Sequence, residues 1–147
     1  MSDEKQFCTF SLQGHFFGIN VLEVQEVFRY QEMTVVPLAP ETITGLINLR
    51  GQIITALDLR KLLKLDERTE GDIPMNVVVR TQDDVVSLLV DEIGDVLEVP
   101  QEKFEPPPEN LQGTIKNLVR GVYKLENKLL LILDTEKVVE LSAVRAA

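Results

Sequence analysis

The chain has 147 residues, of which 44% are hydrophobic and 27% charged, as expected for one ordinary globular domain. Its formal net charge of −9 argues against nucleic acid as a main partner, because binding a phosphate backbone requires basic patches. Cys8 is the only cysteine, which excludes an internal disulfide, and no apolar run reaches the roughly 20 residues needed to span a membrane. These features favour a soluble, cytoplasmic protein.

Short apolar or alternating runs separated by turn residues predict a mainly β protein. The runs "QFCTFSL" and "HFFGI" predict a hairpin around Gln13–Gly14, whereas "VLEVQEVF" (21–28) fits either a helix or a strand. Further strands are expected at 33–36, 46–57, 76–80, 85–90, 95–99, 118–125 and 128–133.

The expected helices are short. Asp58 and Asp134 each end an apolar strand and can cap the backbone amides that follow, which predicts helices after both residues. A single helical turn is expected after Pro40. The charged segment 66–74 and the proline-rich segment 102–113 are expected to be loops.

The two halves of the sequence resemble each other at an offset of 69 or 70 residues. Residues 17–27 align with 86–96, and Arg50–Gly51 aligns with Arg120–Gly121, each pair followed by an aliphatic strand, an aspartate and a basic turn. This pattern predicts two small β-barrels within a single domain (1–147), one over 14–80 and one over 81–147, with the strand at 6–12 joining the second.

Few residues suit catalysis. With one histidine, His15, and one cysteine, Cys8, neither a catalytic dyad nor a metal cluster is well supported, and no glycine-rich loop could hold a phosphate. We therefore expect no enzyme activity, no cofactor and no metal. A small-ligand-binding or hydrolytic β-barrel is the outside alternative, and it would require Asp91, Glu92 or His15 to converge on a deep pocket.

Arg50 is the most suggestive residue, because it places a fixed cation at the tip of an otherwise apolar hairpin. One interpretation is a structural ion pair with a nearby acid. The other is that the hairpin presents the planar guanidinium to a carboxylate or carbonyl group of a partner protein.

The segments "VLEVQEV", "INLRGQIITALDLR" and the repeat around Arg120–Gly121 resemble the CheW family of bacterial chemotaxis coupling proteins, over residues 6–140. The resemblance implies two five-stranded SH3-like barrels with short helices and no catalysis. It implies an adaptor that links methyl-accepting chemoreceptors to the regulatory domain of the histidine kinase CheA, in rings that include other CheW-like domains. Such an adaptor is cytoplasmic and is recruited to the inner face of the membrane through receptors.

Position by position, the resemblance also implies contact residues. The expected receptor-binding residues are Glu26, Gly45, Asn48 and Arg50, and the expected kinase-binding residues are Val24 and Val27. The extra Val119 in "NLVRG" prevents transfer of the Arg50 role to Arg120. A CheW-like adaptor of a type IV pilus (twitching) or another chemosensory pathway is the alternative within the family.

Overall fold

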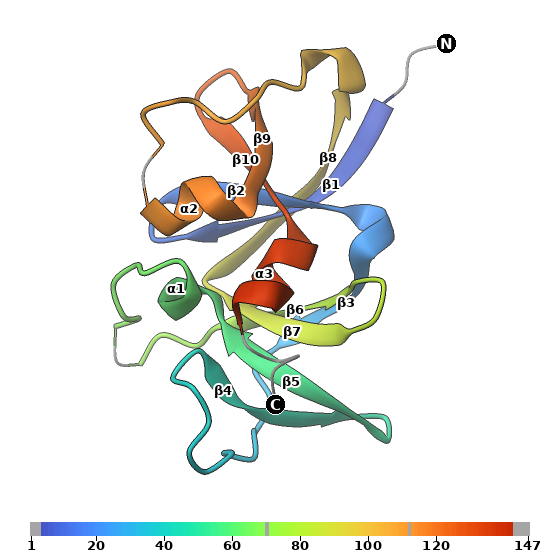
Figure 1. Cartoon of the computed structure of the whole chain (residues 1–147). Coiled ribbons are helices and arrows are strands. Elements are labelled where there is room, and N and C mark those ends of the chain that lie inside the picture. The colour runs from blue at the N-terminus through green and yellow to red at the C-terminus, as the bar shows by residue number, and fades with distance from the viewer. Residues whose placement is uncertain (1–3, 70, 112, 143–147) are drawn as a thin grey trace.

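The computed structural model describes residues 4–69, 71–111 and 113–142 (Figure 1). Its strands are β1 (Glu4–Leu12), β2 (His15–Asn20), β3 (Val24–Arg29), β4 (Ile43–Leu49), β5 (Gln52–Asp58), β6 (Met75–Arg80), β7 (Val85–Val90), β8 (Glu92–Pro100), β9 (Val119–Lys124) and β10 (Leu129–Leu133). The helices are α1 (Leu59–Leu62), α2 (Gly113–Leu118) and α3 (Thr135–Leu141), with 3-10 turns η1 (Val21–Glu23) and η2 (Gln101–Lys103).

The strands form two five-stranded sheets. The lower sheet of Figure 1 has the order β3-β6-β7-β5-β4, and the upper sheet has the order β8-β1-β2-β10-β9. The expected fold class, mainly β with two SH3-like five-stranded units, is confirmed. The two end strands of each sheet do not pair with each other, so the strand order does not close either sheet into a complete barrel.

The expected division between the barrels at residues 14–80 and 81–147 is wrong at two strands. β2 lies in the upper sheet, where it pairs with β1 and β10, and β7 lies in the lower sheet between β6 and β5. Each sheet contains one parallel pair of strands, β2 with β10 in the upper sheet and β5 with β7 in the lower sheet. Apolar periodicity reveals a strand but does not identify its partner. The strand at 6–12 is part of β1 and lies in the upper sheet.

The internal repeat is present in the topology, with β3–β7 equivalent to β8–β10 followed by β1 and β2. The alignment of Arg50 with Arg120 is wrong. The β4–β5 hairpin has a bulge between Ile43 and Gly45, and the matching bulge of β9–β10 lies next to Gly121, so Gly121 corresponds to Gly45. Arg50 lies at a hairpin tip, whereas Arg120 lies within β9.

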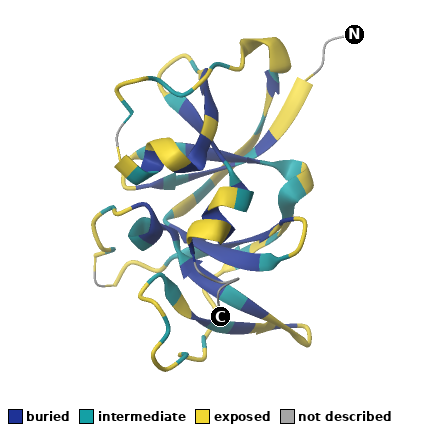
Figure 2. Ribbon diagram, in the orientation of Figure 1, coloured by how far each residue is buried: buried dark blue, intermediate teal, exposed yellow. Residues whose placement is uncertain are grey.

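The largest core lies where the two sheets face each other. It is built from β1, β2, β5, β6, β7, β9 and β10 together with α1, α2 and α3, with Phe10, Phe17, Leu57 and Leu88 among its fully buried residues. Two smaller clusters lie within the separate sheets, around Phe7 and Tyr123 in the upper one and around Ile54 and Val78 in the lower one. Figure 2 shows the buried strands at the centre of the molecule. Burial in one shared core explains how two such small units remain folded.

Both helices predicted from aspartate caps are confirmed. Asp58 accepts hydrogen bonds from the N–H groups of Arg60 and Lys61, and Asp134 accepts one from Lys137 N–H. The ambiguous segment 21–28 divides into η1 and β3.

Two element predictions are wrong, and one helix was not predicted. Residues 33–36 contribute only an isolated bridge from Thr34 to Leu46, and the chain after Pro40 enters β4 without a helix. The segment before β9 forms α2 because Ile115 and Leu118 are buried in the shared core. Most of the expected loops 66–74 and 102–113 are irregular, but Glu70 and Gln112 lie outside the described residues.

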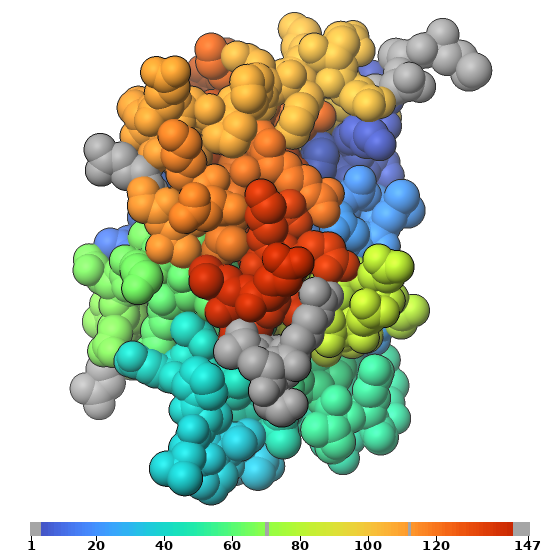
Figure 3. Space-filling view, viewed as in Figure 1, coloured from blue at the N-terminus to red at the C-terminus, as the bar shows by residue number. Residues whose placement is uncertain are grey.

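Within the described ranges, no helix is long and apolar enough to cross a membrane. The face shown in Figure 3 has α2 and α3 lying over the junction between the upper and lower sheets.

Candidate docking site

The tip of the β4–β5 hairpin is a two-residue turn made by Arg50 and Gly51. Leu49 pairs with Gln52, and both turn residues have positive φ, 52° for Arg50 and 87° for Gly51. Hairpin turns of this kind match the twist of the strands they join, and glycine enters that conformation without strain. A non-glycine residue such as Arg50 costs on the order of 1 kcal/mol there. Asn48 fixes the turn, because its side-chain Oδ1 accepts a 2.9 Å hydrogen bond from Gly51 N–H.

Arg50 forms a two-pronged ion pair with Glu26 of β3. Its Nη1 donates to Glu26 Oε2 at 2.9 Å, and its Nη2 donates to Glu26 Oε1. The side chain of Arg50 nevertheless remains 73% exposed, whereas that of Glu26 is 23% exposed. Since β3 and β4 are the two ends of the sheet order, the pair connects opposite edges of the lower sheet.

Both interpretations of Arg50 therefore describe part of the geometry: it is paired with an acid, and it stays open to solvent. An ion pair this exposed contributes at most about 1 kcal/mol to stability. Its clearer effect is to hold the guanidinium plane in one orientation at the surface.

A bulge in β3 decides which way its side chains point. Val24 is opposite Val79, Glu26 is opposite Val78, and Val27 is opposite Val77, so Gln25 is the extra residue. Directly paired residues share a face of the sheet and neighbours alternate. Val24 and Val27 therefore share one face, while Glu26 points to the other.

The two valines on that face differ in exposure. Val24 is partly buried against the shared core, and Val27 is 37% exposed. Val27 is therefore the more accessible of the two expected kinase-contact residues.

Gly45 has a different role from the other expected receptor residues. It is buried, and a Cβ atom at this position would lie 2.8 Å from the backbone oxygen of Thr34 and 3.0 Å from Met33 Cβ. It offers no side chain to a partner and instead allows the chain around Thr34 to bridge to Leu46. The structure thus brings Glu26, Asn48 and Arg50 together at one end of the hairpin, with Gly45 near the start of β4.

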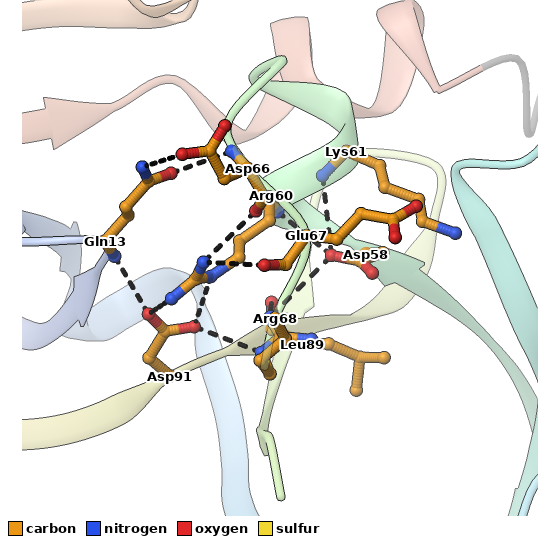
Figure 4. A network of polar contacts seen from close by, with 9 residues as sticks. All are labelled: Gln13, Asp58, Arg60, Lys61, Asp66, Glu67, Arg68, Leu89 and Asp91. Carbon is orange, nitrogen blue, oxygen red and sulfur yellow. Dashed lines mark hydrogen bonds and ion pairs between the residues drawn. The ribbon is translucent and has the colours of Figure 1, made fainter. Parts of the chain in front are cut away.

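A partly buried polar network that sequence reasoning missed lies between the two sheets (Figure 4). Asp91, between β7 and β8, accepts hydrogen bonds from Arg60 Nε at 2.8 Å, from Arg60 Nη2, and from Arg68 Nε at 3.1 Å. It also accepts a 2.8 Å hydrogen bond from the backbone N–H of Gln13, in the β1–β2 turn of the upper sheet. The carboxylate therefore connects both sheets, α1 and the loop after α1.

Burial raises the pKa of the Asp91 carboxyl, but the hydrogen bonds from Arg60, Gln13 N–H and Arg68 outweigh it and leave the pKa below its ordinary value. The hydrogen bond to Asp91 also raises the pKa of Arg60, against the effect of burial. Asp91 is thus charged at neutral pH and acts as a structural anchor. The run "DLR" (58–60) and an aspartate directly after a buried strand were the available sequence signals.

The residues required by the hydrolytic alternative do not converge. Asp91 and Glu92 border one cavity together with Arg60 and Arg68, whereas His15 borders another with Phe16 and Lys128. Asp91 is engaged by two arginines and is a poor base. Among the described residues, no group of three or more His, Cys, Asp or Glu side chains could hold a metal ion. Burial raises the pKa of the Cys8 thiol, which makes it a weak nucleophile at neutral pH.

Comparison with known proteins agrees with the geometry. A family model described as "CheW-like domain" matches residues 6–143. The chain belongs to the CheW-like family. Chemotaxis protein CheW of Bacillus subtilis is 32% identical, over 97% of this chain and 92% of that protein. Chemotaxis protein CheW of Treponema pallidum is 31% identical, over 93% and 84%.

A solved CheW structure shares the fold. The crystal structure of the scaffolding protein TtCheW from Thermoanaerobacter tengcongensis superposes with a TM-score of 0.80 at 30% identity, covering 90% of this chain and 89% of that one. Both sequence and structure therefore relate this chain to chemotaxis scaffolds of the CheW-like family along nearly its whole length.

Proposed function

We propose that this chain is a non-catalytic adaptor that couples methyl-accepting chemoreceptors to the histidine kinase CheA in bacterial chemotaxis arrays. Membership of the CheW-like family supports the proposal. The main structural support is Arg50. Its position is fixed by the hairpin turn and by Glu26, and yet its side chain is mostly exposed to a partner. An adaptor of this kind acts at the inner face of the membrane, where receptors recruit it.

The proposed receptor site is the hairpin end that contains Glu26, Asn48 and Arg50. Arg50 and the amide NH₂ of Asn48 offer donors there, because the turn engages only the Asn48 oxygen, while both Glu26 oxygens accept from Arg50. A receptor carboxylate or backbone carbonyl can dock on the guanidinium with little loss of side-chain freedom. Gly45 supports the site through the backbone.

The proposed kinase site is the apolar face of β3 marked by Val27, with Val24 partly buried behind it. An exposed valine on an edge strand suits an apolar surface of the kinase regulatory domain. Because Glu26 points to the opposite face of β3, one strand can serve two partners at once.

Co-sedimentation with receptor particles and CheA tests both sites. We expect Arg50→Ala to weaken recruitment to receptor particles about tenfold while binding of the isolated kinase is kept. Lys124→Ala is the matched control, because Lys124 is equally exposed but lies in the other sheet. Equal recruitment of wild type and Arg50→Ala would refute the receptor site.

Val27→Asp tests the kinase site in the same assay. We expect it to lower affinity for the kinase about tenfold, because an aspartate would lose its water on docking against an apolar surface. Ile73→Asp is the control, since Ile73 is an exposed residue outside β3. An unchanged kinase affinity on titration calorimetry would remove Val27 from the interface.

A further inference from the structure

A second concave site lies in the upper sheet, away from the hairpin tip. It is a cavity of about 330 Å³, at the lower end of the range for small-molecule sites. Its apolar lining includes Phe7, Tyr123 and Ile132, all buried, and the more exposed Phe104. The Tyr123 ring lies 5.6 Å from Phe7 and 5.4 Å from Phe104 between centroids, so the three rings pack against one another and form an aromatic wall of the cavity.

Gly121 allows this arrangement of rings. A Cβ atom on Gly121 would lie 2.2 Å from Cζ of Phe104, so any larger residue would displace the Phe104 ring. The position of the Phe104 ring in the aromatic wall therefore depends on a glycine in β9 of the upper sheet.

Cationic side chains border the same cavity, although the chain carries a net charge of −9. Lys5 forms no ion pair with any residue in the described ranges. Arg120 contacts Glu23 and Asp134 only at 3.5 Å, longer than a good charge-assisted hydrogen bond, and its side chain is 40% exposed. Asn20 adds a donor, because its Oδ1 accepts from Leu22 N–H and leaves its amide NH₂ for another partner.

Apart from Glu23 and Asp134, which lie beside Arg120, the carboxylates near Lys5 point away from the cavity. Residues along β1 alternate between the two faces of the sheet, so Lys5 and Phe7 share the face of the cavity while Glu4 and Gln6 point to the opposite face. Glu98 is paired with Gln6 and shares that opposite face. Among the described residues, Lys5 is therefore a rim cation without an ion pair, whereas the Arg120 charge is shared with Glu23 and Asp134.

The hydroxyl of Tyr123 provides the second polar feature. The residue is only 3% exposed, and its hydroxyl makes no hydrogen bond to the described residues. Because every fully buried side-chain oxygen or nitrogen in those residues has a partner, the hydroxyl must be reachable from open space, which the cavity supplies. Burial raises the pKa of Tyr123, so it stays a protonated donor at neutral pH.

We propose that this cavity binds a small aromatic carboxylate. Its ring would pack against the wall formed by Phe7, Phe104 and Tyr123, and its carboxylate would accept hydrogen bonds from Arg120, Lys5 and neighbouring donors. Aromatic boxes also bind quaternary ammonium groups, but Lys5 and Arg120 would repel a cation here. Every polar side chain assigned above to the rim can donate a hydrogen bond, which suits an anion.

An NMR titration of the ¹⁵N-labelled full chain with 3-phenylpropionate tests the site. We expect saturable shifts centred on the amides of Lys5, Asn20, Arg120 and Tyr123. The neutral 3-phenylpropionamide and the cationic 3-phenylpropylamine have the same ring and chain length, and we expect each to bind at least about tenfold more weakly. Absence of saturable shifts with the carboxylate, or equal binding of all three compounds, would overturn the proposal.

Variants locate the anion contact. Arg120→Gln and Lys5→Gln should each weaken 3-phenylpropionate binding about tenfold while leaving the spectrum of the folded chain intact, because both side chains are at the surface. Lys124→Gln removes the same charge from the same strand as Arg120 but lies outside the cavity lining, so binding should be unchanged. Equal loss in Lys124→Gln would mean that only overall charge matters and would overturn the site.

Discussion

Replacing Asp91 by asparagine should destabilise the fold strongly, because the network at Asp91 holds the two sheets together. The side chains of Asp91, Arg60 and Arg68 are only 17%, 14% and 12% exposed. Breaking a fully buried ion pair from one side costs about 3–5 kcal/mol, and this partly buried network belongs at the lower end of that range. Arg60 would keep the carbonyl of Asp66 at 3.1 Å, and Arg68 would keep Asp58 at 3.7 Å. We therefore expect a loss of about 3 kcal/mol at pH 7.

The destabilisation should depend on pH in a defined direction. The pKa of Asp91 is lowered in the folded chain, so its stabilisation is complete above the ordinary carboxyl pKa of about 4. It is lost as the pH falls from that value through the lowered pKa, because the folded state must then take up a proton that the unfolded state already carries. The difference between wild type and Asp91→Asn should therefore shrink below about pH 4.

Urea unfolding followed by far-ultraviolet circular dichroism measures the effect, since the chain has no tryptophan. The control is Glu92→Gln, which removes the same charge from the adjacent, exposed residue bordering the same cavity; we expect a change within about 0.5 kcal/mol. A loss below about 1 kcal/mol at pH 7 for Asp91→Asn, or a loss that persists unchanged at pH 3, would refute the network as the connection between the sheets.

Three further changes test other parts of the structure. Gly45→Ala should lower stability by about 1–3 kcal/mol, because its Cβ would meet a backbone oxygen that cannot easily move; an unchanged urea midpoint would contradict the close approach of Thr34. The double variant Glu26→Arg/Arg50→Glu should recover the small stability lost by either single change but not receptor recruitment; recovered recruitment would show that the pair only positions the hairpin. Asp134→Ala should cost about 1 kcal/mol and speed amide exchange in α3, and equal exchange rates would mean that the cap is unimportant.

Local features of the sequence predicted local structure well. The aspartates after apolar strands identified two helix starts, because an aspartate can satisfy the free amides of the first turn wherever the helix lies. The hairpin tip at Arg50–Gly51 was predicted for a similar reason, since a glycine between two aliphatic runs permits the required backbone conformation.

Features that depend on distant pairing were not predictable. In a regular strand, Val24 and Val27 would point to opposite faces, because side chains alternate between the two faces. The extra residue at the bulge, Gln25, places both valines on one face of β3. Asp91 lies 31 residues from Arg60 and 23 from Arg68, so no local pattern connects them. The alignment of Arg50 with Arg120 failed because the same Arg-Gly letters recur at a different place in the second hairpin. Gly45 and Gly121 occupy equivalent positions, and Leu125 and Lys128 are still hydrogen-bonded, so the turn that corresponds to Arg50–Gly51 is Glu126–Asn127.

The proposed adaptor role also explains why rigidity matters more than stability at these sites. A scaffold gains affinity when its docking groups need little ordering on binding, and the exposed Glu26–Arg50 pair contributes orientation at almost no gain in folding energy. The partly buried Asp91 network supplies the complementary part, because it fixes the lower sheet against the upper one and therefore holds β3 and the hairpin tip in a constant relation to the rest of the molecule. Two proposed partners meeting opposite faces of β3 would then be held at a fixed angle, which is the mechanical requirement for coupling one to the other.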